Sequence, residues 1–219
     1  MLKKIKKKIF PIAKLAFDTY HLKKRKFKYE NIEVVIHPEV FPPHFTISTK
    51  ILLDYLLQLS LKNKSLLELG CGSGIISLLA ASKGARVTAT DINPTAIELL
   101  KDASIQNNLT LDIFHSNLFD KIDDQVFDYI IINPPYYPKN PKNIKEKAWF
   151  CGENFEYFKE LFLQLPRHLA LNTWMILSED CEISHIKKLA IKNGLSLELI
   201  LEKSVVGEKN YIFNIQKPT

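Results

Sequence analysis

The chain has 219 residues, of which 46% are hydrophobic and 25% are charged, a balance typical of a globular domain with one sizeable core. Its net charge of +6 is unevenly distributed, because residues 1–28 contain eleven Lys or Arg against the single Asp18. The three cysteines, Cys71, Cys151 and Cys181, lie far apart without a C-x-x-C pair, which argues against a disulfide scaffold and a zinc site. We therefore expect a protein of the reducing cytoplasm with no bound metal.

The N-terminal residues 1–29 are expected to form a basic arm, and residues 30–219 one catalytic domain. Leu2, Ile5 and Ile9 have helix-like spacing among lysines, and Pro11 should interrupt the pattern, which predicts one or two short amphipathic helices. No apolar run approaches the roughly 20 residues that cross a bilayer, so we expect neither a signal peptide nor a transmembrane segment. A solvated tail, an RNA or ribosome contact and a membrane-surface contact are three open interpretations of the arm.

From Ile32 onward, short β-rich stretches alternate with longer helical stretches, which is the pattern of a parallel sheet covered by helices. The predicted strands are 32–36, 65–69, 86–91, 111–115, 126–132, 173–178, 195–205 and 210–215. One helix is predicted before residue 60 and a second begins near residue 75. Three more are predicted over 94–107, 155–171 and 184–192. Three consecutive isoleucines, 130–132, indicate a central strand buried on both faces. The short link around Gly207 predicts a hairpin whose last strand runs antiparallel to the others.

A glycine-rich turn, Glu68-Leu-Gly-Cys-Gly-Ser-Gly74, directly follows the strand 65–69, and Asp91 ends the next strand. Glycines in such a turn let the backbone approach a nucleotide closely, and a carboxylate at the next strand end can accept both ribose hydroxyls. Gly70, Gly72, Gly74 and Asp91 together therefore predict a cofactor of the adenosine type.

Charge and spacing favour S-adenosylmethionine over a dinucleotide. A dinucleotide site has the pattern Gly-x-Gly-x-x-Gly, whereas here the third glycine comes one residue early. Glu68 would repel a pyrophosphate but could attract the ammonium group of a methionine moiety. A solvated carboxylate at the strand end is the other interpretation of Glu68. We interpret Cys71 as a small turn residue with a useful backbone N–H and not as a reactive thiol.

The sequence Asn133-Pro134-Pro135-Tyr136 follows the buried strand 126–132, at the edge where open α/β folds carry their chemistry. Two prolines fix the backbone, so the Asn133 side chain and the Pro134 carbonyl can act as two acceptors aimed at one point. Two acceptors suit a planar NH2 group, whose delocalised lone pair they would orient and activate for methyl transfer. A rigid turn in which Asn133 only caps the backbone is the alternative.

With these motifs in place, the segment from Val40 onward resembles the class I S-adenosylmethionine-dependent methyltransferases with an Asn-Pro-Pro-Tyr motif. It is most similar to compact release-factor glutamine methyltransferases, also through residues 40–43, 48–54 and 148–154. The resemblance implies a Rossmann-like α/β fold with a seven-stranded, mostly parallel sheet, an antiparallel C-terminal strand, and helices on both faces.

The same resemblance implies a role for each matching residue. The cofactor S-adenosyl-L-methionine would be bound by Thr49, Glu68, Gly70, Cys71, Gly72, Gly74, Asp91, Ile92, Asn117, Leu118 and Asn133. In this set the glycine loop and Glu68 would hold the methionine part, Asp91 the ribose, and Asn117 the adenine amino group. Asn133, Pro134, Pro135 and Tyr136 would form the catalytic motif.

Two acceptors remain open at this stage. The first is a glutamine of a protein such as a translation release factor, favoured by the similarity over residues 148–154. The second is an exocyclic amino group of adenine or guanine in RNA or DNA, favoured by the basic arm and by four lysines in residues 137–147. A binding module without catalysis and a nicotinamide-dependent oxidoreductase fit the motifs less well.

Overall fold

The computed structural model describes residues 23–43, 46–123, 125–205 and 207–218. The predicted helices of the arm therefore fall largely outside the described residues. The last five residues of that arm, Arg25–Tyr29, form strand β1, which pairs antiparallel with β2 (Ile32–Ile36) in a two-stranded sheet. The helical prediction was wrong for this stretch because Phe27 and Tyr29 alternate with charged residues and pack on the core, as a strand places them.

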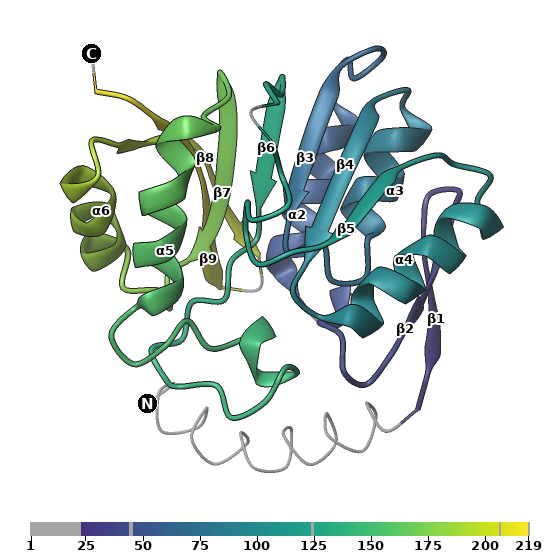
Figure 1. Cartoon of the computed structure of the whole chain (residues 1–219), viewed down its shortest axis with the longest axis horizontal. Coiled ribbons are helices and arrows are strands. Elements are labelled where there is room, and N and C mark those ends of the chain that lie inside the picture. The colour runs from purple at the N-terminus through teal and green to yellow at the C-terminus, as the bar shows by residue number, and fades with distance from the viewer. Residues whose placement is uncertain (1–22, 44–45, 124, 206, 219) are drawn as a thin grey trace.

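The main sheet has seven strands in the order β5-β4-β3-β6-β7-β9-β8, in which β9 pairs antiparallel with both β7 and β8 and all other neighbouring strands pair in parallel. This confirms the predicted topology (Figure 1). The strands are β3 (Ser65–Leu69), β4 (Arg86–Asp91), β5 (Asp112–His115), β6 (Tyr129–Ile132), β7 (Asn172–Ser178), β8 (Ser196–Val205) and β9 (Glu208–Gln216).

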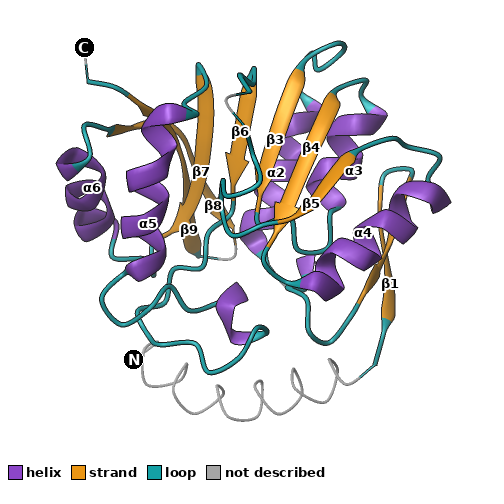
Figure 2. Cartoon of the chain, in the orientation of Figure 1, coloured by secondary structure: helices purple, strands orange, loops and turns teal. Residues whose placement is uncertain are grey.

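Helices cover both faces of the sheet (Figure 2). They are α2 (Ile47–Leu57), α3 (Ile75–Ser82), α4 (Pro94–Gln106), α5 (Glu156–Gln164) and α6 (Ile183–Lys192), with short 3-10 turns η2 (Glu146–Ala148) and η3 (Leu165–Arg167). The predicted helix 155–171 ends earlier because Pro166 has no N–H to continue the α-helical hydrogen bonds. Strand β6 also begins later than predicted, at Tyr129.

Two hydrophobic cores result, one on each face. Helices α2, α3 and α4 and the β1–β2 hairpin pack on the first face, and α5 and α6 pack on the second. Strand β6 supplies both cores, because Ile131 points into the first while Ile130 and Ile132 point into the second. All three isoleucines are fully buried, which confirms that this strand lies at the centre of the sheet.

The parallel strands all end at one edge of the sheet, and the chain runs across this edge twice. Residues 37–43 pass it on the way from β2 to α2, and residues 133–155 pass it between β6 and α5 (Figure 1). The glycine loop, Asp91 and the Asn-Pro-Pro-Tyr motif therefore lie together beside the carboxyl ends of β3, β4 and β6.

Gly74 provides a test of how the glycine loop is packed. Its backbone is left-handed (φ +73°), and a Cβ atom there would collide with the Leu100 side chain on α4. We expect Gly74→Ala to lower the free energy of unfolding by about 3 kcal/mol, from left-handed strain and overpacking together. Gly194→Ala is the matched control, because Gly194 is also left-handed (φ +69°) with no atom within 4 Å of the added Cβ.

The control should lose only about 1 to 2 kcal/mol, the cost of the left-handed backbone alone. Urea denaturation of both variants measures the difference. Equal losses would show that contact with Leu100 does not constrain the loop.

Candidate functional site

A cavity of about 470 Å³ lies at the carboxyl ends of β3, β4 and β6. Most of the predicted site residues line it, namely Thr49, Glu68, Gly70, Cys71, Gly72, Asp91, Ile92, Asn117, Leu118, Asn133 and Pro135. Gly74, Pro134 and Tyr136 are not among the lining residues. Gly74 begins α3 and packs under Leu100, whereas Tyr136 packs against the second core with its ring 4.8 Å from that of Tyr137.

The glycine loop is attached to the end of β4 through its own N–H groups. The N–H groups of Gly70 and Cys71 both donate to the Thr90 carbonyl, at 2.8 and 2.9 Å. The N–H of Gly72 donates to the Asp91 carboxylate at 2.8 Å. The Cys71 N–H is therefore used inside the protein and does not face a ligand. The Cys71 thiol is buried, and burial raises its pKa well above the ordinary value, which makes it an unreactive turn residue.

Asp91 is held in place by backbone donors on two sides. Its second oxygen accepts from the Asn93 N–H at 2.8 Å, in addition to the bond from Gly72. Burial raises the pKa of Asp91, while these backbone bonds oppose the shift. The Asn93 side chain then caps α4 by accepting from the Thr95 N–H, as the Asn-Pro start of that helix predicts. The bonds from the Gly72 and Asn93 N–H groups fix the Asp91 carboxylate at the cavity wall.

Glu68 is buried, so the interpretation as a solvated strand-end carboxylate was wrong. Only 4% of the residue is exposed, and its Oε2 accepts from the backbone N–H and the hydroxyl of Ser77 in α3. Burial raises its pKa to about 8, more than the two bonds to Ser77 lower it. A second acidic group, Asp91, adds repulsion. The cavity wall thus contains a carboxyl group that is half-titrated near pH 8.

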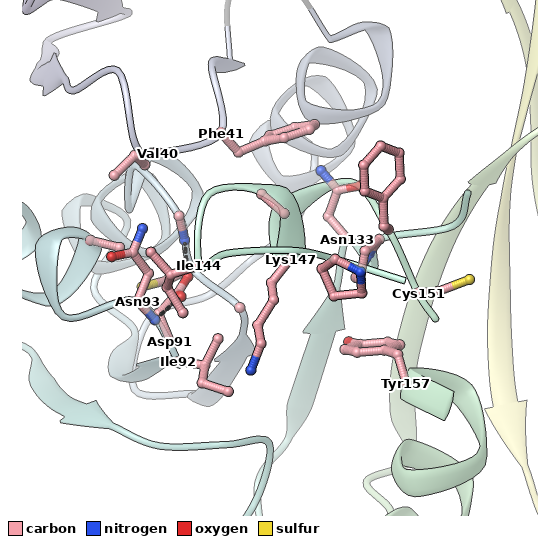
Figure 3. Close-up of a pocket in the computed structure, with 18 of the residues that line it drawn as sticks. Val40, Phe41, Asp91, Ile92, Asn93, Asn133, Ile144, Lys147, Cys151 and Tyr157 are labelled. Carbon is pink, nitrogen blue, oxygen red and sulfur yellow. Dashed lines mark hydrogen bonds between the residues drawn. The ribbon is translucent and has the colours of Figure 1, made fainter. Parts of the chain in front are cut away.

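Asn133 enters the same cavity from the end of β6. Its side-chain Nδ2 donates to Thr49 Oγ1 on α2 at 3.3 Å, and among the described residues Oδ1 makes no hydrogen bond and can act as an acceptor. Asp91 and Asn133 lie at opposite ends of the cavity in Figure 3. The sheet therefore brings a carboxylate and a carboxamide oxygen into one cavity, from strands β4 and β6 on either side of β3.

The residues predicted to lie near the adenine of the cofactor also line the cavity. Ile92, Asn117 and Leu118 line the cavity, and Asn117 is exposed. The His115 ring lies 2.9 Å from the Ile92 carbonyl oxygen. Leu118 has a left-handed backbone (φ +46°), which is unusual for a leucine and costs energy.

The cavity also contains residues that the sequence motifs did not identify. Phe41, Ile144, Lys147, Phe150 and Tyr157 line it, and Lys147 and Tyr157 extend into its centre in Figure 3. The similarity over residues 40–43 and 148–154 is the sequence signal for Phe41 and Phe150, and Lys147 is one of the four lysines in residues 137–147. The positions of Ile144 and Tyr157 required the tertiary structure.

Residues 137–152 form a cover over the cavity and are held by specific contacts. The Phe41 and Trp149 rings are 4.7 Å apart, which joins the cover to the segment before α2. The Tyr137 N–H donates to the Trp149 carbonyl at 3.1 Å, and the Cys151 N–H donates to the Tyr137 carbonyl at 3.0 Å. Backbone hydrogen bonds thus join the two ends of the cover directly after the Asn-Pro-Pro-Tyr motif.

No described helix is long and apolar enough to span a membrane. Within the same part of the chain, no group of three or more His, Cys, Asp or Glu side chains is arranged to hold a metal ion.

The raised pKa of Glu68 predicts how stability depends on pH. A carboxyl group whose pKa is higher in the folded state than its ordinary 4.5 binds more protons when folded, so its contribution to stability is lost as pH rises toward 8. Between pH 4.5 and about 8, the free energy of unfolding of wild type should therefore fall relative to that of Glu68→Gln. The expected fall is up to about 1.4 kcal/mol per pH unit.

Urea denaturation at several pH values, without ligand, measures this difference. Parallel pH profiles for the two proteins would mean that Glu68 is ionised in the folded state, contrary to its burial.

Named relatives cover part of the chain. A protein of Methanocaldococcus jannaschii that bears the name protein N5-glutamine methyltransferase is 41% identical over 110 residues, which is 50% of this chain and 53% of the relative. The release factor glutamine methyltransferase of Aquifex aeolicus is 29% identical over 186 residues, 78% of this chain and 62% of the relative. The chain therefore spans less than two thirds of either protein.

A solved structure and a family model extend the comparison. The crystal structure of a methyltransferase from Pyrococcus furiosus matches with a TM-score of 0.64 at 20% identity, over 96% of this chain and 100% of that one. Its likeness confirms the fold. The family model described as the methyltransferase small domain matches residues 31–149, more than half of the chain, and the protein therefore belongs to the methyltransferase small domain family.

Proposed function

We propose that the protein is an S-adenosylmethionine-dependent N-methyltransferase that methylates the side-chain amide of a protein glutamine, as in a translation release factor. One observation carries the proposal. Asp91 and the free amide acceptor of Asn133 share one cavity with a glycine loop, at neighbouring strand ends. A cofactor site thus adjoins a site for a planar nitrogen.

The residues of the cavity fit the proposed cofactor. Gly70 and Gly72 have left-handed backbones (φ +74° and +53°) and no side chain, so a ligand can approach the loop closely. Three carboxylates besides Asp91 line the cavity, at Glu39, Glu156 and Glu160, together with the buried carboxyl group of Glu68 and one lysine, Lys147. S-adenosylmethionine carries a sulfonium and an ammonium group, and the excess of carboxylates over Lys147 attracts that positive charge. Bound in the cavity, it would supply the electrophilic methyl group.

The chain's own contribution to the chemistry lies at the acceptor nitrogen. An amide NH2 has a delocalised lone pair, so the protein must orient the nitrogen and stabilise the positive charge that develops on it. Asn133 Oδ1 can accept one of its two protons, and the Pro134 carbonyl is our proposed second acceptor. Residues of the cover 137–152 line the same cavity, so a bound acceptor would lie between the cover and Asn133.

The names of the two relatives support glutamine as the acceptor. Both are named for transfer to glutamine. The proposed partner is therefore a protein that presents a glutamine in an extended or loop segment to the cover.

Two substitutions separate cofactor binding from catalysis. Asn133→Ala should reduce turnover by at least about 100-fold, because a preorganised polar group at the reacting atom is lost. Its affinity for S-adenosylhomocysteine, measured by calorimetry, should stay within about threefold of wild type. Asp91→Ala should abolish that calorimetric signal. Equal loss of both properties in Asn133→Ala would mean that Asn133 only shapes the cofactor pocket.

The acceptor is tested by incubating the purified protein, labelled S-adenosylmethionine and a release factor. We expect label on a single glutamine, located by peptide mass spectrometry, and none on a release factor in which that glutamine is replaced by alanine. Asn133→Ala is the matched enzyme control. No transfer from the active protein to any protein fraction would refute glutamine as the acceptor.

An exocyclic amino group of a nucleobase is the second candidate, favoured by the charge of the cover. Lys139, Lys142, Lys145 and Lys147 lie in it, and Lys139 is placed 4.6 Å from the Phe150 ring centroid. This candidate predicts RNA binding whose affinity falls steeply with salt.

Deleting residues 1–22, which leaves β1 intact, tests the arm in this binding. The deletion removes six lysines and should flatten the salt dependence. An unchanged salt slope would exclude the arm from nucleic-acid binding.

A further inference from the structure

Thr49 was expected to contact the cofactor, yet its side-chain hydrogen bonds are made to other residues of the protein. It lies in the first turn of α2, is 4% exposed, and accepts from Asn133 Nδ2 at 3.3 Å. Its hydroxyl oxygen is also 2.9 Å from that of Thr46, the residue before the helix. Thr46 Oγ1 is in turn 3.3 Å from the Pro43 carbonyl oxygen.

These contacts meet at the Thr49 hydroxyl oxygen. The Thr46 hydroxyl donates to it at 2.9 Å and the Asn133 side-chain N–H donates to it at 3.3 Å, so Thr49 uses both of its acceptor sites. Thr46 Oγ1 also lies 3.3 Å from the Pro43 carbonyl oxygen, which places Thr46 between Pro43 and Thr49. The bond between Asn133 and Thr49 therefore runs from the amide N–H to the hydroxyl oxygen.

The direction matters because a carboxamide has a donor end and an acceptor end of nearly the same shape. If Asn133 were rotated by half a turn, its NH2 would face the acceptor NH2, and neither could accept. The oxygen of Thr49 bonds the donor end and so keeps Oδ1 toward the cavity. Within the described part of the chain, Asn133 has no other side-chain partner.

We propose that Thr49 is a positioning residue that fixes the orientation of the Asn133 carboxamide, with Thr46 and the Pro43 carbonyl as its support. The inference rests on the proposed methyl transfer to an NH2 group. It also connects two parts of the site, because Pro43 belongs to the segment that lines the cavity before α2. A change in that segment would reach Asn133 through these contacts.

The decisive variant is Thr49→Val, which keeps the shape of the side chain and removes the hydroxyl. We expect kcat/KM for the acceptor to fall about tenfold, the equivalent of one hydrogen bond that orients the reacting group. The dissociation constant of S-adenosylhomocysteine should stay within about twofold. Thr49→Ser, which retains the hydroxyl, should restore activity to within about twofold of wild type.

Thr88→Val is the matched control. Thr88 is also a buried threonine, 4% exposed, but it lies in the middle of β4 and is not among the residues that line the cavity. This variant should therefore keep wild-type kcat/KM. A loss in Thr88→Val equal to that in Thr49→Val would assign the effect to general packing.

A readout without turnover separates this inference from the proposed function. In 15N-labelled protein, the side-chain NH2 signals of Asn133 are identified by their absence from Asn133→Ala. In Thr49→Val we expect the bonded proton to shift upfield and to exchange with water about tenfold faster. Unchanged signals would overturn the inference even if no acceptor were methylated, while an inactive wild type with the expected shift would refute only the proposed function.

Unchanged kcat/KM in Thr49→Val would also overturn it. So would a loss of S-adenosylhomocysteine affinity as large as the loss of kcat/KM, because Thr49 would then act on the cofactor.

Discussion

Three N–H groups of the glycine loop bond to the end of β4, two to the Thr90 carbonyl and one to the Asp91 carboxylate. These bonds join the turn after one strand to the acidic residue that ends the next. The loop therefore does not act mainly as a row of amide donors for a ligand. It keeps a side-chain-free surface beside a fixed carboxylate, and the cavity depends on both.

The electrostatics of the cavity follow from this arrangement. Glu68 is buried and Asp91 is partly buried, and burial raises the pKa of each. Such groups are costly in an empty cavity but favourable beside a ligand that carries positive charge. The burial of Glu68 thus has two expected effects. It lowers the stability of the empty protein at higher pH, and it favours binding of the proposed cationic cofactor.

The acceptor side of the cavity is built differently, from chain segments outside the sheet. The cover 137–152 closes over Asn133 through backbone bonds and the contact of Phe41 with Trp149. The contacts from Pro43 to Asn133 pass through the same region. In this proposal, residues far apart in sequence orient the Asn133 carboxamide. Its orientation therefore depends on the tertiary structure and not on the local sequence.

Local sequence determined the element order, the antiparallel last strand, and the buried central strand, because hydrophobic periodicity and turn residues act over short distances. It also placed Asp91 and Asn133 at strand ends, where the topology of parallel sheets brings them together. Only the tertiary structure decided which oxygens and N–H groups remain free. Glu68 turned out to be bonded to Ser77, the Cys71 N–H to Thr90, and the donor end of Asn133 to Thr49. Those partners lie on other elements, and a hydrogen bond depends on distances that no local pattern encodes.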